Sequence, residues 1–404
     1  MVTPISALRS PAPGSAAPLA LPRKRRVLFV TDFYMESVLA GVVEHAREAG
    51  WDLIANMRFH GKFPSESSAD GILATAVTAR VQNWLSGWQG VPVVQMYASG
   101  PQLPHPLVES DFAAAGRAGA QHLLELGHIH FGFYWLQALP DTEQVLAGFA
   151  AAVRGAGRTM HHLDFPAAHP GRPLEEIPRE ARLAWLAEEL RRLPKPLAMM
   201  GDDDRRSLEV LAACERAGLR VPEDVAILGC EDRAIELGLS RLPMSSVDMN
   251  HPRIGREAAA LLEDLMNGVV PRARHVRVPP LGVIGRRSTA TFVSDSPGVT
   301  AALLHLREHF HERLHLPALA RLAGMSERLF ESEFKRCVGR SPRAELQRAR
   351  LACATRLLRD TDLKLDAVAA ESGFGTAKRL CAIFAQTYSA TPTAWRQQPR
   401  LFEK

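Results

Sequence analysis

Residues 316–335 read LPALARLAGMSERLFESEFK, and residues 365–384 read LDAVAAESGFGTAKRLCAIF. The first stretch places the small residue Ala320 where two helices would approach closely, then Gly324 at a bend and Ser326 at a helix N-cap. The second stretch repeats this order with one extra residue in its turn. Each stretch is typical of a helix-turn-helix, and two such units in one chain predict a protein that contacts two successive major grooves of DNA.

The second helix of each unit carries the residues that we expect to contact DNA. Phe330 and Phe334 lie one helical turn apart and should face the core, which leaves the opposite face outward. Arg and Gln side chains can read guanine and adenine edges, whereas Lys most often holds phosphate. The predicted DNA-binding residues are Glu327, Arg328, Ser332 and Lys335 in the first unit, and Thr376, Ala377, Lys378, Arg379, Ala382 and Gln386 in the second. The alternative for any one of them is an ordinary solvated surface residue.

The charge of the chain is unevenly distributed. The formal net charge of the 404 residues is +5, and residues 297–404 hold 18 Lys and Arg against 11 Asp and Glu. The basic excess therefore belongs to the helix-turn-helix region, as contact with phosphate requires. The length and the 46% of hydrophobic residues indicate two or three domains with substantial cores, not a disordered protein.

Cysteine usage and the N-terminal segment indicate where the chain works. Five cysteines, an odd number without a CxxC pair, argue against a disulfide framework and against a Cys-based zinc site, so a reducing cytoplasm fits best. No apolar run approaches the length of a membrane span, and in residues 1–25 the basic cluster follows the Ala/Pro stretch, the reverse of a signal peptide. We interpret residues 1–25 as a disordered tail, and we expect no cofactor, no metal and no membrane partner.

Between residues 26 and 288, short apolar runs alternate with helix-length segments. The strand-like runs lie at 27–31, 52–55, 71–75, 91–96, 129–135, 197–201 and 225–229, and the helix-like segments at 37–49, 112–126, 144–154, 176–192, 204–217 and 252–266. Continuous apolar strands with helical crossovers predict parallel sheets covered on both faces. The region 26–288 is long for one such sheet, so we expect two lobes that share a cleft. Residues 289–299, rich in Ser, Thr, Pro and Gly, are the expected linker to an all-α domain at 300–398.

Carboxylates follow two of the predicted strands. Residues 202–204 are all Asp and come after LAMMG, and Glu231 and Asp232 come shortly after VAILG. Carboxylates at strand ends can accept hydrogen bonds from neighbouring hydroxyls, which suits a polyol ligand. The alternative is that an Asp here only caps the next helix, a role that stabilises by about 1 kcal/mol. We favour Asp202 and Glu231 as ligand-binding residues because ligands of open α/β sheets bind at the carboxyl ends of the strands.

The C-terminal stretch GFGTAKRLCAIFAQTYSATPTAWR resembles the closing part of the AraC-type DNA-binding domain. The segments ADGILAT, ESDFAAAGRAGAQHLLELGHIHFGFY, GLRVPEDVAILGCED and VPPLGVIGRRST are similar to the periplasmic-binding-protein-like core of LacI/GalR-type repressors and occur in that family's order. The resemblance implies an α/β two-lobed sensor with parallel sheets, followed by an all-α domain with two helix-turn-helix units. It also implies a cytoplasmic transcription regulator, an activator of sugar catabolism that binds operator DNA and a sugar or polyol effector, works as a homodimer and contacts RNA polymerase.

Carried over residue by residue, the resemblance extends the ligand pocket to Asp32, Asp111 and Val145. Sugar-binding relatives have an Arg at the position of Val145 and an Asp at that of Glu231, whereas Asp202 matches the family pattern. Without that Arg the pocket lacks a five-donor clamp for ring oxygen and hydroxyls, so pentose binding does not carry over. A ligand-independent DNA-binding regulator with a degenerate sensor therefore stays open as the alternative.

Two other motifs point to enzymes. Residues 311–315, HERLH, spell the HExxH signature of zinc proteases at the end of an expected helix, but Pro317 follows closely and no third ligand is apparent. Cys230 follows a predicted strand as a nucleophile would, but the carboxylates of Glu231 and Asp232 next to it should raise the pKa of its thiol. An enzyme tethered to DNA and using Cys230 is therefore the weaker alternative, and we expect no enzymatic activity.

Overall fold

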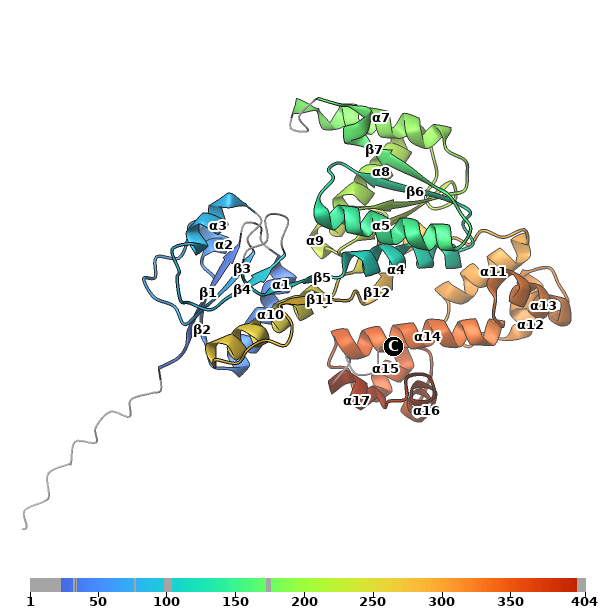
Figure 1. Cartoon of the computed structure of the whole chain (residues 1–404). Helices are drawn as coiled ribbons and strands as arrows, with labels where there is room; N and C mark the ends of the chain where they lie inside the picture. Colours follow the sequence, from blue (N-terminus) through green and yellow to red (C-terminus); the bar gives the residue numbers. More distant parts are fainter. Residues whose placement is uncertain are drawn as a thin grey trace, which may run out of the picture. The chain divides into compact units, whose positions relative to one another are not determined.

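The chain folds into two compact units (Figure 1). The computed structural model describes residues 23–31, 33, 35–75, 78–97, 104–171 and 176–397. Unit 1 contains Met1–Glu109 and His251–Val276, and unit 2 contains Ser110–Asn250 and Arg277–Lys404. The region expected to be a two-lobed sensor is thus divided between the units, and unit 2 also carries the C-terminal helices.

Unit 1 is built on a six-stranded sheet in the order β11-β5-β4-β3-β1-β2. Its strands are β1 (Arg26–Thr31), β2 (Asp52–Ile54), β3 (Gly71–Thr75), β4 (Val93–Met96), β5 (Leu107–Ser110) and β11 (His275–Val278). β1 pairs in parallel with β2 and β3, and β4 pairs in parallel with β3 and β5. The central strands consist of consecutive buried residues, as expected for a parallel sheet that is covered on both faces.

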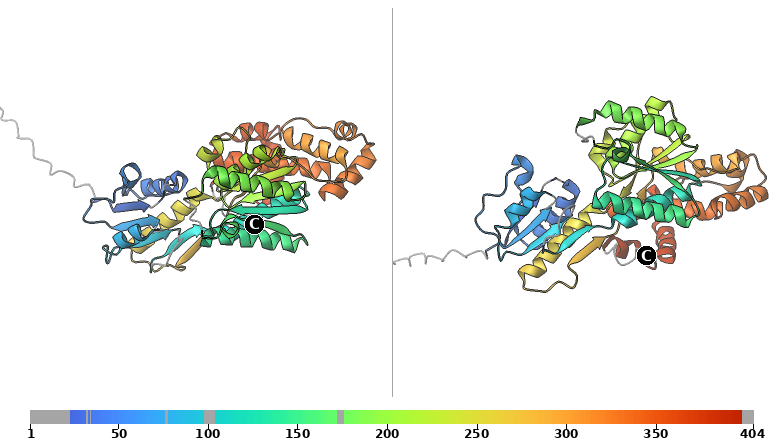
Figure 2. Two further views of the ribbon diagram at one scale, coloured as in Figure 1. Left: turned by 90° about the horizontal axis from the view of Figure 1, so that it is seen from above. Right: turned by 45° about the horizontal axis from the view of Figure 1, so that its top comes forward.

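Helices cover both faces of this sheet. They are α1 (Glu36–Glu48), α2 (Met57–His60), α3 (Ala79–Leu85) and α10 (His251–Met266). α2 and α3 bury Met57, Val81 and Leu85 in one core with β1 and β3. α10 packs against α1, β3 and β4, although it lies far from them in the sequence (Figure 2).

Unit 2 begins with a second six-stranded sheet, in the order β12-β10-β9-β8-β6-β7. Its strands are β6 (His130–Trp135), β7 (Met160–Asp164), β8 (Leu197–Gly201), β9 (Val225–Cys230), β10 (Ser245–Asp248) and β12 (Gly282–Ile284), with β12 antiparallel to β10. The helices around it are α4 (Phe112–Glu125), α5 (Pro140–Gly155), α6 (Phe165–Ala168), α7 (Arg179–Arg192), α8 (Asp204–Ala217), α9 (Ala234–Gly238) and the short η2 (Arg287–Thr289). The carboxyl ends of β6, β8, β9 and β10 meet at one edge because these strands run parallel.

α4 and α5 pack with their backbones in contact. A Cβ atom on Gly116 of α4 would lie 2.0 Å from the carbonyl oxygen of Val145, and one on Gly148 of α5 would lie 2.0 Å from that of Ala113. No side chain fits at either position, since protein interiors are close-packed. The two glycines therefore set the distance between the helices, and Val145 is left only 2% exposed.

The C-terminal part of unit 2 is helical. It consists of α11 (Pro297–Glu308), α12 (Leu316–Leu322), α13 (Glu327–Val338), α14 (Pro342–Asp360), α15 (Leu365–Glu371), α16 (Ala377–Tyr388) and α17 (Pro392–Gln397). These helices form two hydrophobic cores, one around Phe330 and Phe334 and one around Phe384 and Trp395. α14 runs from the first core to the second (Figure 1). Within the described part of the chain, no helix has the length and hydropathy to cross a membrane.

The predicted linker 289–299 makes contacts with the elements on both sides of it. Phe292 is 4% exposed and packs in the core of the first helix-turn-helix unit. The N–H of Val293 donates to the carbonyl of Leu126 at the end of α4 (2.8 Å). Phe292 is the one aromatic residue in this Ser- and Thr-rich stretch, and it packs into a core.

The first strand is preceded by residues that already belong to unit 1. Arg23 forms an ion pair with Asp70 at 3.2 Å, and the carbonyl of Arg25 accepts a hydrogen bond from the N–H of Asp52 (2.8 Å). The folded chain therefore starts before the end of the tail predicted at 1–25. The remainder of that tail, residues 1–22, lies outside the described residues.

Candidate functional site: two helix-turn-helix units and a carboxylate-lined strand edge

The first helix-turn-helix unit has a glycine turn and a serine cap. α12 is followed by Gly324, whose φ of 67° lies in the left-handed region that glycine adopts without strain. The hydroxyl of Ser326 accepts a hydrogen bond from the N–H of Leu329 (3.4 Å) and so begins α13. Phe330 and Phe334 have no exposed surface, which leaves the opposite face of α13 to solvent.

The second unit accommodates its extra turn residue with a second glycine. Gly373 and Gly375 have φ values of 77° and 79°, and Phe374 between them is 3% exposed. The longer turn therefore inserts an aromatic ring into the core of this unit. The hydroxyl of Thr376 accepts a hydrogen bond from the N–H of Arg379 (3.3 Å), so Thr376 caps α16 in addition to its predicted contact with DNA.

The predicted DNA-binding residues lie on the solvent-facing sides of α13 and α16, with one exception. The exposed residues are Glu327, Arg328, Ser332, Lys335, Thr376, Lys378, Arg379, Ala382 and Gln386. Ala377 is half-buried at the start of α16, so it offers less surface than predicted. Which of these side chains contacts a base and which contacts a phosphate stays a prediction.

The second helix of each unit, α13 in the first and α16 in the second, is called its recognition helix. The two recognition helices differ in charge. α16 carries Lys378 and Arg379 and has no acidic residue. α13 has three glutamates, and its Arg336 is held at 2.8 Å by the carboxylates of both Asp295 and Glu333. Because a paired cation attracts phosphate less strongly, the positive potential of α16 exceeds that of α13.

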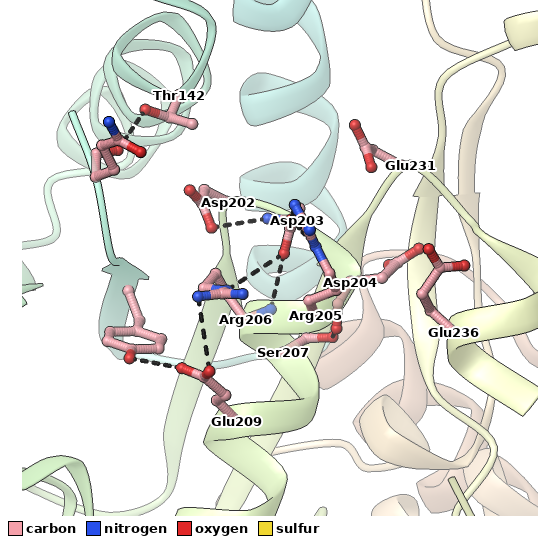
Figure 3. A network of polar contacts seen from close by, with 12 residues as sticks. Thr142, Asp202, Asp203, Asp204, Arg205, Arg206, Ser207, Glu209, Glu231 and Glu236 are labelled. Carbon is pink, nitrogen blue, oxygen red and sulfur yellow. Dashed lines mark hydrogen bonds and ion pairs between the residues drawn. The ribbon is translucent and has the colours of Figure 1, made fainter. Parts of the chain in front are cut away.

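Asp202 and Glu231 lie at the carboxyl ends of the neighbouring strands β8 and β9 (Figure 3). The N–H of Asp202 donates to the carbonyl of Tyr134 in β6 (3.2 Å), and its carboxylate accepts a hydrogen bond from the N–H of Asp203 (2.9 Å). Burial raises the pKa of Asp202 well above its usual value, and the charges of Asp203 and Glu231 raise it further. The two predicted residues are therefore close enough to influence each other electrostatically.

The helix-capping alternative applies to Asp203 and not to Asp202. The carboxylate of Asp203 accepts a hydrogen bond from the N–H of Arg206 (2.8 Å) and caps α8. Asp204 is fully buried and accepts hydrogen bonds from the Ser246 hydroxyl (2.6 Å) and the N–H of Arg233 (2.7 Å). Of the three consecutive aspartates, two are thus occupied by structural roles.

Glu231 has a strained backbone and a perturbed carboxyl group. Its φ is 102°, in a region that costs a residue with a side chain about 1 to 3 kcal/mol and that is found most often at functional sites. The N–H of Glu231 donates to the carbonyl of Val247 (2.9 Å), and its carboxylate forms an ion pair with Arg233. Burial raises the pKa of Glu231 to about 7 although Arg233 lowers it. Glu231 therefore changes its charge near neutral pH.

The other predicted ligand residues have different surroundings. The carboxylate of Asp111 accepts a hydrogen bond from the N–H of Ala114 (2.8 Å) and caps α4. Val145 is buried in the α4–α5 contact and supplies no polar group. Asp32 lies outside the described residues. The structure thus brings Asp202 and Glu231 together, and it gives Asp111 and Val145 structural roles.

Asp141 is a largely buried acidic residue that is close enough to Asp203 for the two charges to interact. α5 begins at Pro140, whereas the apolar pattern predicted a helix from residue 144. Burial raises the pKa of Asp141, and the charge of Asp203 adds to the shift. The next residue, Thr142, donates its hydroxyl to the carbonyls of Gln137 and Leu139. The missed signal was a Pro followed by an acidic residue after a strand, which is typical of a helix start.

Neither enzyme-like motif has the geometry of an active site. The HExxH motif binds zinc only when its two His side chains lie one turn apart on a helix. Residues 311–315 follow the end of α11 and are not helical, so His311 and His315 do not have this arrangement. Among the described residues no group of three or more His, Cys, Asp or Glu side chains is placed to hold a metal. The thiol of Cys230 is buried and donates to Sδ of Met249 at 3.6 Å, and burial followed by the charge of Glu231 raises its pKa well above the usual value. A nucleophilic Cys requires the opposite shift.

Comparison with known proteins covers both parts of the chain. Residues 120–289 match a periplasmic binding protein-like domain, and residues 319–398 match a helix-turn-helix domain. The xylose operon regulatory protein of Escherichia coli K12 is 26% identical over 373 residues, which span 90% of this chain and 94% of that protein. The chain is homologous to the xylose operon regulators. It is a transcription regulator with an AraC-type DNA-binding domain, as the resemblance of its C-terminal stretch implied.

Other relatives agree in the order of the domains. The xylose operon regulatory protein of Haemophilus influenzae is 24% identical over 374 residues, covering 90% of this chain and 95% of that protein. The structure of a xylose-binding transcription activator superimposes with a TM-score of 0.58 at 23% identity and covers 93% of this chain and 98% of its own. The fold of a two-lobed sensor with parallel sheets followed by helix-turn-helix units is therefore confirmed.

Proposed function

We propose that this regulator responds to a sugar or another polyol and activates catabolic genes. In this proposal the chain acts in the cytoplasm as a homodimer, binds operator DNA and contacts RNA polymerase. The observation that carries it is the combination of two exposed recognition helices with Asp202 and Glu231 at one strand edge. The homologous regulators of Escherichia coli and Haemophilus influenzae control xylose operons, which supports a sugar as effector.

The chemistry of the strand edge suits neutral hydroxyl groups. A carboxylate accepts two or more hydrogen bonds, and a bond to a charged acceptor contributes about 1.5 to 3 kcal/mol. Arg233, paired with Glu231, offers N–H donors for ring or hydroxyl oxygens beside the acceptors. The aliphatic, buried Val145 does not add a further clamp, so we assign the effector to the polyol class and not specifically to pentoses.

Regulation requires that the effector binds one conformational state more tightly than another. A ligand shifts an equilibrium only by its difference in affinity for the two states. The same coupling free energy then changes the affinity for DNA, and DNA changes the affinity for the effector by the same factor. Effector and operator binding should therefore be measurable through each other.

A thermal-shift screen of the full chain against sugars and sugar alcohols tests this proposal. At a concentration about 100 times its Kd, a specific ligand should stabilise the protein by about 2.7 kcal/mol. The same ligand should change the affinity for DNA. Glu231→Gln should weaken the stabilisation without abolishing it, because only the ionised carboxylate is lost, whereas Glu215→Gln on the exposed side of α8 should retain it in full. A panel without any stabilising sugar, together with unchanged DNA affinity, would refute a polyol effector.

The second candidate function is a regulator that binds DNA without an effector. The ion pair between Glu231 and Arg233 favours it, since the carboxylate already has a cationic partner. Val145 favours it as well, because the position lacks a polar side chain.

The weaker alternative, an enzyme that uses Cys230, predicts rapid alkylation of that thiol by iodoacetamide in the native protein. The buried thiol should instead react only after unfolding.

A further inference from the structure

The two helix-turn-helix units have separate hydrophobic cores that meet on α14. Leu346 packs against the core of the first unit, and Leu351 belongs to the core of the second. The change from one core to the other thus occurs within one and a half turns of a single helix. A helix of this length can bend, so the orientation of the two units depends on what else connects them.

Arg350 lies at this transition and reaches back to the first unit. Its Nε donates to the carbonyl of Phe310 and its Nη2 donates to the carbonyl of Glu312, both at 2.7 Å. These carbonyls belong to the connection between α11 and α12. The side chain of Arg350 is 7% exposed, and burial lowers its pKa, with a smaller contribution from the charge of Arg379. A buried cation is costly unless its donors are satisfied, so the two carbonyls hold the guanidinium in place.

The turn of the second unit rests on the same connection. A Cβ atom on Gly373 would lie 2.7 Å from both Cα of His311 and the carbonyl oxygen of Phe310, and 3.0 Å from Nε of Arg350. Gly373 is the first of the two glycines between α15 and α16, so its position affects where the recognition helix α16 begins. The loop 310–312, Arg350 and Gly373 together form a contact that we call the junction.

We propose that Arg350 is a positioning residue that fixes the second recognition helix relative to the first and thereby sets the DNA spacing that the protein accepts. Successive major grooves on one face of DNA are about 34 Å, or 10 to 10.5 base pairs, apart. Two linked units gain affinity from simultaneous binding only when their geometry matches that spacing. A fixed junction should therefore give strong binding at one spacing and weak binding at others. The proposal rests on DNA binding by both units.

The test uses the full chain and a DNA duplex enriched from a random library with the wild-type protein. Related duplexes carry one to three base pairs inserted or deleted between the two contacted segments, and a shorter duplex contains only one segment. The variants are Arg350→Met, which removes the donors, and Arg350→Lys, which keeps the charge but cannot span two carbonyls. Gly373→Ala disturbs the junction from the other side. Leu351→Ala is the control, because it weakens the second core and leaves the two hydrogen-bond donors of Arg350 in place.

The wild type should prefer the selected spacing by about ten- to a hundredfold. Both Arg350 variants and Gly373→Ala should bind all spacings with similar affinity, while their affinity for the one-segment duplex stays within about twofold of wild type. Leu351→Ala should lower thermal stability and keep the spacing preference. If the Arg350 variants keep that preference, or lose affinity evenly on long and short duplexes as a destabilised unit would, the positioning role is refuted. Failure of the wild type to enrich any duplex from the library would instead refute the underlying DNA-binding function.

Discussion

The carboxylate of Glu345 in α14 accepts a hydrogen bond from Nε of Arg307 in α11 at 3.0 Å. Glu345 has no exposed surface, and Arg348 of the same helix donates to it as well, with its Nε 3.0 Å from the second carboxylate oxygen. Burial alone would raise the pKa of Glu345, but the guanidinium groups of Arg348 and Arg307 outweigh burial and hold the pKa at about 2. The first helix of the DNA-binding domain is thereby attached to the helix that carries both units.

Replacing Glu345 by Gln should destabilise the DNA-binding domain. The partly buried Arg307 and the more exposed Arg348 would lose their counter-ion, at a cost of about 1.5 to 3 kcal/mol in the free energy of unfolding measured with urea. Because the folded pKa lies below the ordinary value of 4.5, the stabilisation is complete above pH 4.5 and is lost as the pH falls towards 2. The difference between wild type and variant should therefore shrink over that range. Glu371→Gln, at an exposed position of α15, should change the free energy by less than about 0.5 kcal/mol at any pH.

Adding one methyl group between α4 and α5 should destabilise unit 2. Gly116→Ala places a carbon atom 2.0 Å from the carbonyl oxygen of Val145, so the helices must separate. The expected loss is about 1 to 3 kcal/mol or more, measured by chemical denaturation. Gly155→Ala at the end of α5 is the matched control, because the added carbon meets no atom within 4 Å. The control should be neutral or stabilise by up to about 1 kcal/mol. Equal effects of both substitutions would show that the glycine contact does not limit packing.

The affinity for a polyol effector should depend on pH through Glu231. Burial raises the pKa of Glu231 to about 7, and only the ionised form accepts hydrogen bonds at both oxygens. Affinity should therefore rise about tenfold between pH 6 and pH 8 and then level off. For folding the sign is opposite: the protonated group favours the folded state below pH 4.5, and this contribution is lost as the pH rises through 7. Titration calorimetry with Glu231→Gln should give an affinity without this pH dependence. A variant that keeps the wild-type profile would assign it to another group.

Arg379 should read a base. It is exposed on α16, the recognition helix without acidic residues, and its guanidinium can donate two hydrogen bonds to guanine. Arg379→Ala should cost about 1 to 3 kcal/mol on the selected duplex and should abolish discrimination at one base pair. Binding assays on the selected duplex and on random DNA distinguish a base contact from a phosphate contact. An equal loss on both would make Arg379 a phosphate contact.

Elements with strong periodicity were predicted well from the sequence, and short polar ones were not. β3, β8 and α8 have the predicted bounds, because residues that favour turns or caps mark their ends. β3 begins at Gly71, β8 ends at Gly201, and α8 ends before Gly218. The runs that form β5, β7, β10 and β11 are only four or five residues long and contain Ser, His or Arg, and β12 has only three residues, so none of them stands out from a loop in local composition. Their strand character comes from pairing with segments elsewhere in the sequence, such as β12 with β10.

The candidate site was predicted in part for a similar reason. Strand-end position identified Asp202 and Glu231, since it follows from the alternation of strands and helices along the chain. The assignment of the cap to Asp203, the pairing of Glu231 with Arg233 and the burial of Val145 depend on side-chain contacts that no local pattern encodes. The repeat at residues 316–335 and 365–384 was the more reliable guide because both turns and both caps are local.

Salt-dependent binding of the full chain to duplex DNA tests the assignment of DNA binding to the C-terminal helices most directly. Measured between about 50 and 200 mM salt, the affinity should fall steeply, and the log–log slope should become about 0.9 units shallower for each phosphate-contacting cation removed. Lys378→Ala on α16 should produce such a change, and Lys62→Ala on the exposed surface of unit 1 should not. Absence of salt-dependent binding, or an equal change of slope in both variants, would contradict DNA binding through these helices.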